Sequence, residues 1–149
     1  MRVVRLCTRA YPPLNGIGAS ITGGRWNSPG KQVVYTASCG ALAGLEYLVH
    51  VGKRLPTGML LVLVQIPKKV RIERTAGWAP ADLAASRRIG DEWIESGASA
   101  VLEVPSVLIP RQRNYLLNPL HPSFVAIKIV EQTPFAFDTR LLSSIPPPP

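Results

Sequence analysis

The segment Met59–Ile66 constrains the fold more than any other part of the chain. Its residues are apolar almost without interruption, and Pro67 ends the run. The run is far too short to span a bilayer, which takes about 20 apolar residues in a helix. A short apolar run of this kind is typical of a β-strand that is covered on both faces. The sequence therefore predicts a sheet with further layers packed on each side.

Other segments supply the partners of this strand. Strand composition or alternation marks five of them: Arg2–Thr8, Gln32–Ala37, Lys68–Arg74, Ala100–Val104 and Ser123–Val130. We expect one helix over 38–51, which Ser38 would cap and Gly52 would end. A second helix over 80–96, which Gly90 could interrupt, would pack through Leu83, Ile89, Trp93 and Ile94. Glycine and proline predict irregular segments over 10–32 and 114–122.

The length of 149 residues is typical of one domain with a core of its own. Neither a repeat nor a linker divides the sequence, so we expect a single compact α+β domain over 1–142, with mixed sheets and a few helices. The proline-rich tail 143–149 has the composition of a disordered segment.

Cysteine usage and the N-terminal residues indicate the compartment. The two cysteines, Cys7 and Cys39, form neither a disulfide framework nor a CxxC motif, which favours a reducing environment. Charges break the N-terminal apolar run too early for a signal peptide. These features predict a cytoplasmic protein without a membrane partner.

The net charge of +8 favours an anionic partner. Nucleic acid is the less favoured choice, because the basic residues lie in separate pairs and no nucleic-acid-binding motif accompanies them. The alternatives that remain open are an anionic ligand and a generic basic surface. A non-enzymatic basic module that binds nucleic acid stays a further hypothesis.

Glu46 is the most conspicuous residue for function. It is the first carboxylate in the chain, since residues 1–45 contain none. In a helix it would lie about 40° from Leu42, at the margin of a stripe that Leu42, Leu45 and Val49 form. An unpaired buried charge is costly, so Glu46 should be paired or functional. The structural alternatives are a salt bridge with Arg5 or simple exposure at the edge of the stripe.

Two residues before Glu46 could join it. Gly23 and Gly24 allow close approach of a ligand, and Arg25 beside them could bind a phosphate through two donors. The alternative is a turn whose arginine points to solvent. Tyr35, on the strand before the helix, could line a ligand or simply pack.

Other polar residues carry weaker signals. Ser106 follows a strand, but no G-x-S-x-G motif surrounds it, so a serine-hydrolase triad is not indicated. His50 and His121 lack the spacing of metal ligands, and the sequence predicts no metal site.

Six short motifs follow one another along the chain: Gly24–Asn27, Val33–Ala37, Ala43–His50, Ile89–Trp93, Val104–Ser106 and Asn114–Pro119. Together they resemble the RES-domain family, from about Arg5 to Leu141. The family is named for an Arg, a Glu and a Ser, which correspond here to Arg25, Glu46 and Ser106.

The resemblance implies a fold similar to ADP-ribosyltransferases and a role as toxin of a bacterial toxin–antitoxin pair. The partner would be an Xre-type helix-turn-helix antitoxin, in a complex whose oligomeric state the sequence leaves open. The implied activity is depletion of NAD⁺ by hydrolysis or phosphorolysis, with ADP-ribosylation of a protein as the alternative. NAD⁺ would be the substrate, and no cofactor is implied.

The resemblance also implies the roles of individual residues. Arg25, Tyr35 and Glu46 would form the core of the site, with Ser106 and Asn118 as further substrate-binding residues. Cleavage of the nicotinamide–ribose bond passes through an oxocarbenium-like state that a carboxylate stabilises. We therefore expect Glu46 to stabilise this cation, Arg25 to bind the phosphates and Tyr35 to line the nicotinamide. Ser106 would position a ribose or amide group.

Overall fold

The computed structural model describes residues 1–51, 55–75 and 82–143. Its strands are β1 (Arg2–Thr8), β2 (Val34–Ala37), β3 (Met59–Gln65), β4 (Ile72–Arg74), β5 (Val101–Pro105), β6 (Arg113–Leu117) and β7 (Lys128–Phe135). Its helices are α1 (Ile17–Thr22), α2 (Gly40–Leu48), α3 (Leu83–Ser96), α4 (Arg140–Ser143) and the 3₁₀ helix η1 (Pro122–Ala126). Helix α2 ends at Leu48, before the end predicted near Val51. Gly52, the predicted start of the second helix at 80 and residues 144–149 of the tail lie outside the described residues.

The seven strands form one sheet in the order β4-β5-β6-β2-β1-β3-β7. Only β4 and β5 are parallel, and the other adjacent pairs are antiparallel. The sheet is therefore mixed, and the prediction of a single α+β domain is confirmed. Strand β3 lies between β1 and β7.

Both faces of the sheet are covered, as the apolar run of β3 predicts. Met59 and Leu61 belong to a cluster packed beneath α2, whereas Val62 and Val64 belong to a cluster on the other face. The second cluster also receives Phe124 of η1. The period of two along a strand explains why neighbouring residues of β3 serve different layers.

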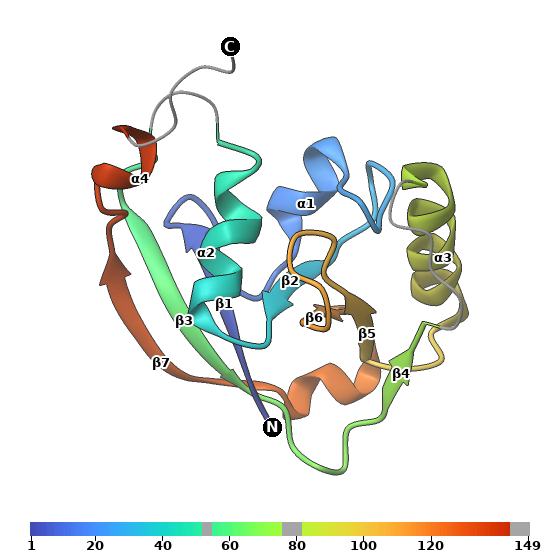
Figure 1. Cartoon of the computed structure of the whole chain (residues 1–149). Helices are drawn as coiled ribbons and strands as arrows, with labels where there is room; N and C mark the ends of the chain where they lie inside the picture. The colour runs from blue at the N-terminus through green and yellow to red at the C-terminus, as the bar shows by residue number, and fades with distance from the viewer. Residues whose placement is uncertain (52–54, 76–81, 144–149) are drawn as a thin grey trace.

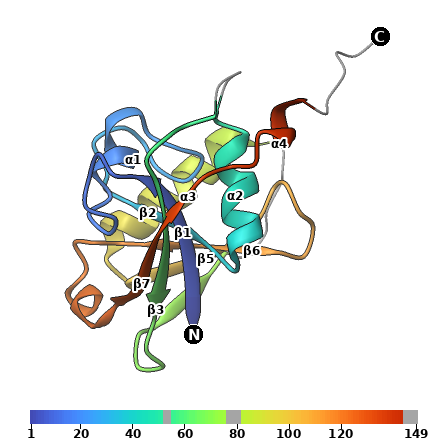
Figure 2. The ribbon, with the colours of Figure 1, turned by 90° about the vertical axis from the view of Figure 1, so that its left-hand side faces the viewer.

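Helices α2 and α3 cover two parts of one face. Helix α2 lies beside β1 and β2, and α3 lies toward the β5 side of the sheet (Figure 1). Viewed from the side, α2 again lies next to β1 (Figure 2). The strand register connects the two parts of this face. Ala37 under α2 is opposite Asn114 of β6. Asn114 is in turn opposite Val104, which lies under α3. The strands β2 and β6 therefore run between the two helix-covered regions.

Several predicted strand and loop boundaries are wrong. The segment predicted to be a loop from Asn114 contains β6, whose residues Tyr115, Leu116 and Leu117 are buried between two partner strands. The predicted strand at Ser123 begins only at Lys128. Before it lies η1, which starts at Pro122 and is capped by the His121 side chain. Local hydrogen bonding and the proline ring favour a helical turn there over an extended strand.

The predictions for other segments need smaller corrections. Of the predicted strand Lys68–Arg74, only β4 is a strand. The irregular segment 10–32 contains the short helix α1. Helix α3 passes through Gly90 without a break, and its Leu83 is exposed, although Ile89, Trp93 and Ile94 pack as predicted. Cys39 is the N-cap of α2 in place of Ser38, whose hydroxyl donates to Gln112 Oε1.

Candidate active site

The buried side of α2 differs from the one that its aliphatic pattern predicts, while Glu46 stays half-buried beside Leu42. The predicted stripe is wrong, because Leu45 and Val49 are 42% and 56% exposed. The helix packs through Leu42 and Ala43, and through Tyr47, whose ring contacts Phe137. Tyrosine has an apolar body that packs as well as an aliphatic side chain, which shifts the buried side of the helix.

The half-buried Glu46 carboxylate accepts two hydrogen bonds at the same oxygen. Ser106 Oγ donates to Oε1 at 2.7 Å and Asn114 Nδ2 donates to it at 2.6 Å. Ser106 follows β5 and Asn114 lies in β6, so one hairpin orients the carboxylate of α2. Among the ion pairs of the described residues, none joins Glu46 to Arg5, whose Nη1 donates instead to the Tyr35 carbonyl.

Ser106 is buried and its hydroxyl is fully engaged. Its O–H donates to Glu46, while the oxygen accepts the N–H groups of Leu108 and Ile109 at 3.1 Å each. The hydroxyl therefore holds both the carboxylate and the loop between β5 and β6. This arrangement suits a residue that positions another group better than one that attacks a substrate.

The turn that carries Arg25 rests on the Tyr35 hydroxyl. That hydroxyl accepts the N–H of Trp26 at 3.0 Å and donates to Asn27 Oδ1 at 2.7 Å. Gly24 lies so close that a Cβ would be 2.5 Å from the hydroxyl oxygen. Glycine at this position therefore allows the turn to fold over the tyrosine.

Burial raises the pKa of the Tyr35 phenol far above its usual value. The Trp26 N–H and the charges of Arg87 and Arg25 oppose this rise without cancelling it, and Asp91 adds to it. The phenol is thus protonated, as its hydrogen bond to Asn27 requires. Arg25 is half-buried and near enough to Tyr35 for its charge to act on the ring.

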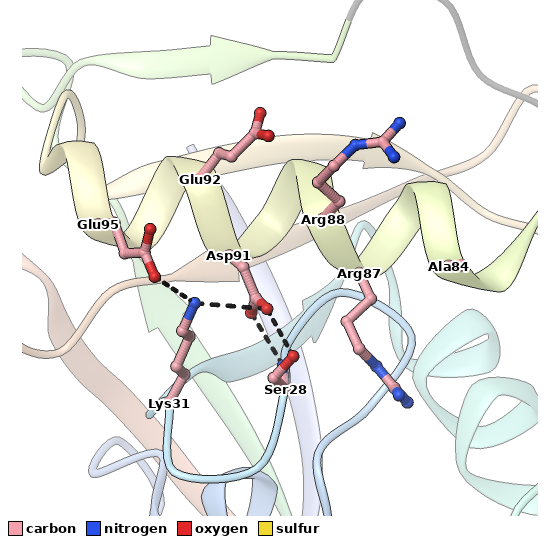
Figure 3. Close-up of a pocket in the computed structure, with 8 residues that line it drawn as sticks. All are labelled: Ser28, Lys31, Ala84, Arg87, Arg88, Asp91, Glu92 and Glu95. Carbon is pink, nitrogen blue, oxygen red and sulfur yellow. Dashed lines mark hydrogen bonds and ion pairs between the residues drawn. The ribbon is translucent and has the colours of Figure 1, made fainter.

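Helix α3 holds the same turn from the other side. Arg87 donates through Nε and Nη2 to the Gly24 carbonyl, at 3.1 and 3.0 Å. Asp91 accepts from the N–H and the hydroxyl of Ser28, at 2.8 and 2.5 Å, and pairs with Lys31 (Figure 3). Although burial opposes it, the Ser28 hydrogen bonds and Lys31 hold the pKa of Asp91 below its usual value.

The structure joins the predicted residues in two groups on one face of the sheet, where Tyr35 is opposite Leu116 and Ala37 is opposite Asn114. Glu46 and Ser106 are in direct contact, and Tyr35 supports the turn that bears Arg25. Asn118 lies at the other end of β6, where its Oδ1 accepts the N–H of Leu120 and caps a turn. The strand rises about 3.3 Å per residue, so Asn118 is far from Asn114 along it.

Three residues of this region were not predicted from the sequence: Asn114, Arg87 and Asp91. Asn114 belongs to a segment that its turn residues predict to be a loop, and in the sequence the α3 residues look like ordinary surface charges. A strand over 113–117 could have indicated a role for Asn114. In a strand its side chain lies on the same face as that of Leu116, two residues later, which is apolar.

A shallow depression of about 420 Å³ lies along the outside of α3, and Figure 3 shows its lining. Its lysine, Lys31, pairs with Asp91 and Glu95. The charged groups are thus partly neutralised by one another, and Glu46 is not part of the lining. In the described ranges no group of three or more His, Cys, Asp or Glu side chains could hold a metal. No helix found there is long and apolar enough to cross a membrane.

Comparison with known proteins identifies relatives of this chain. A family model described as the RES domain matches residues 2–138. A protein of Sphingobium sp. (strain YBL2) named "Prs ADP-ribosylating toxin" is 39% identical in an alignment of length 139 that covers 87% of this chain and 86% of the relative. "Toxin Res" of Yersinia enterocolitica is 38% identical over 152 residues, covering 95% of this chain and 99% of the relative.

A solved structure shares the fold. The crystal structure of the M. tuberculosis MbcT–MbcA toxin–antitoxin complex contains a chain that superimposes with a TM-score of 0.71. The alignment covers 91% of this chain and 84% of that one, at 14% sequence identity. The family model spans nearly all of the sequence, and the protein is a member of the RES-domain family.

Proposed function

We propose that the protein is the toxin of a toxin–antitoxin pair and that it consumes NAD⁺ by cleaving the nicotinamide–ribose bond. One observation carries the proposal: a hairpin holds the carboxylate of Glu46 through two donors, on the face of the sheet to which Tyr35, the support of the Arg25 turn, also belongs. Family membership adds support, because related proteins are named as toxins.

The chemistry requires few groups. As the glycosidic bond breaks, positive charge develops on the ribose, and an oriented carboxylate stabilises it. Nicotinamide leaves as a neutral molecule, so no general acid has to protonate it. Glu46 would therefore interact with the ribose and its cationic centre, and a single carboxylate can suffice.

The remaining residues bind and orient the substrate. Arg25 would bind the phosphates, since a guanidinium pairs with phosphate oxygens through two donors. The Tyr35 ring would line the nicotinamide subsite, while its hydroxyl maintains the turn through Trp26 and Asn27. Ser106 would act by holding Glu46.

Glu46→Gln tests this mechanism directly. The amide oxygen can accept both hydrogen bonds that Oε1 accepts now, so the variant removes the charge and keeps the geometry. We expect NAD⁺ consumption to disappear while the circular dichroism spectrum and the unfolding temperature stay unchanged. Glu92→Gln, an exposed glutamate of α3, is the matched control and should retain full activity. Undiminished NAD⁺ loss in Glu46→Gln would refute the mechanism.

A second candidate is transfer of ADP-ribose to a protein. The name of the Sphingobium relative, which describes an ADP-ribosylating toxin, favours this acceptor over water or phosphate. Purified protein is incubated with labelled NAD⁺, with and without inorganic phosphate and with a lysate as the source of acceptors. Label on protein indicates transfer, free ADP-ribose indicates hydrolysis, and a phosphorylated ADP-ribose indicates phosphorolysis.

The partner follows from the same reasoning. We propose as antitoxin an Xre-type helix-turn-helix protein that inserts a segment into the site, because the solved chain of similar fold comes from a toxin–antitoxin complex. Co-purified complex should leave NAD⁺ intact, and the toxin alone should consume it. A complex that is as active as the toxin alone would contradict this arrangement.

A further inference from the structure

The side chain of Asn114 uses one half of its amide and leaves the other half without a partner. Its Nδ2 donates to Glu46 Oε1 at 2.6 Å. Its Oδ1 is buried and has no hydrogen-bond partner in the described part of the chain. A buried polar atom without a partner lowers stability, so folding by itself does not account for an amide here.

The orientation of the amide is dictated by Glu46. If the amide were turned over, Oδ1 would face the carboxylate oxygen, and two acceptors would repel each other. The amide therefore donates to the carboxylate and leaves its own oxygen unsatisfied. The contact with Glu46 determines which of the two groups is satisfied.

The cross-strand neighbours of Asn114 are apolar, and the pairing of its strand fixes its backbone. Strand β6 is paired on both sides, and the residues opposite Asn114 on the neighbouring strands are Ala37 and Val104, both buried. Cross-strand neighbours of this kind favour an apolar side chain. The same pairing fixes the backbone of Asn114, so its side chain is a firm support for a residue of α2.

We propose that Asn114 is a positioning residue for Glu46, an inference that rests on the proposed function. Together with Ser106 it fixes the plane of the carboxylate, and hence the place of Oε2, relative to the substrate. The two donors differ in what else they do. Ser106 also holds the backbone of its loop through Leu108 and Ile109, whereas the amide of Asn114 leaves its second group unused.

The first test is the kinetics of Asn114→Ala with NAD⁺ as substrate. We expect kcat to fall roughly 10- to 100-fold, because a small displacement of a reacting group costs this much in rate. The KM for NAD⁺ should stay within about twofold, since a residue that acts only through Glu46 does not bind the substrate itself. The unfolding temperature should not fall by more than about 3 °C, because the variant also removes the unsatisfied oxygen.

The second test is the pH profile of Asn114→Asp, which is nearly isosteric. While the introduced carboxyl keeps its proton, its O–H can donate to Glu46 Oε1 as the amide does. Two carboxyl groups in contact share a proton, and this raises the pKa of the pair. When pH rises and that proton is lost, two like charges repel and Glu46 leaves its position. Activity should therefore fall with rising pH in this variant only.

Gln112→Glu is the control for added charge on the same hairpin. Gln112 is exposed, and its Oε1 accepts from Ser38, which a carboxylate can also do. This variant should keep the wild-type kcat and pH profile. A merely structural role of Asn114 predicts a lower unfolding temperature without the new pH dependence.

The outcomes separate the two proposals. A wild-type protein that consumes no NAD⁺ refutes the proposed function, and this inference falls with it. A wild-type protein that consumes NAD⁺, together with an Asn114→Ala variant of unchanged kcat or an Asn114→Asp variant of wild-type pH profile, overturns the inference alone.

Discussion

Gly90 of α3 lies directly against the backbone of Trp26. A Cβ at Gly90 would be 1.8 Å from the Trp26 carbonyl oxygen and 2.7 Å from its carbonyl carbon. Because the obstacle is backbone, it cannot move aside as the end of a side chain can. The absence of a side chain at Gly90 therefore allows α3 to hold the turn that carries Arg25.

Gly90→Ala should destabilise the protein although alanine favours helices. Overpacking against the Trp26 backbone should cost about 3 kcal/mol, which exceeds the gain of up to about 1 kcal/mol in helix propensity. Urea unfolding measures the difference. Gly18→Ala in α1 is the matched control, because its Cβ meets only Tyr11 at 3.9 Å. Equal stability of Gly90→Ala and wild type would show that α3 does not pack on Trp26 as described.

Arg87→Lys should reduce activity more than stability. The guanidinium donates twice to the Gly24 carbonyl, and a lysine ammonium cannot reproduce both bonds in the same geometry. We expect the KM for NAD⁺ to rise severalfold as the Arg25 turn loses its support, with about 1 kcal/mol lost in the free energy of unfolding. Arg88→Lys, its exposed neighbour, should match the wild type. A KM unchanged in both variants would remove Arg87 from the support of the turn.

Tyr35→Phe should change the stability of the protein at high pH. Because burial raises the pKa of Tyr35, the unfolded chain loses this proton near pH 10 while the folded protein keeps it. The folded state then binds more protons than the unfolded state. The contribution of Tyr35 to the free energy of unfolding is therefore complete below about pH 10 and is lost as pH rises further. The free energy of unfolding should fall less steeply above pH 10 in Tyr35→Phe than in wild type. At neutral pH the variant should be about 1–3 kcal/mol less stable, because Trp26 and Asn27 lose a buried partner.

Urea unfolding at several pH values between 7 and 11 measures both effects of Tyr35→Phe. Tyr47 and Tyr115 also have raised pKa values, so they contribute to the alkaline slope of both proteins. The difference between the two slopes therefore isolates Tyr35. Parallel slopes would mean that the Tyr35 hydroxyl is accessible to water.

Parts of the fold could be predicted because they depend on local pattern. The apolar run of β3 and the strand-forming composition of β1 and β2 identify strands whatever their partners are. The end of α3 is equally local, since Gly97 adopts the left-handed conformation that glycine favours after a helix. Predicted strand boundaries were wrong where pairing with strands distant in the sequence decides the structure. Residues Asn114–Leu117 form a strand because β2 and β5 supply hydrogen-bonding partners on each side.

The candidate site, like the fold, could be predicted from the sequence only in part. Gly24, Arg25, Tyr35 and Glu46 could be named from the sequence, because a glycine turn, an isolated carboxylate and an ordered set of motifs are visible in it. Their contacts could not. The pairing of Glu46 with Ser106 and Asn114, and of the Arg25 turn with Arg87, joins residues from separate elements of the chain.

The sequence by itself determined the class of fold through composition and periodicity, and it pointed to the family and to the candidate site residues through an ordered set of motifs. The tertiary structure alone decided which side of α2 is buried and which donors hold Glu46. It also decided which half of the Asn114 amide remains unsatisfied. The physical reason is that burial and hydrogen bonding depend on the distance between groups in space, and that distance exists only after β5, β6 and α3 have packed around the turn.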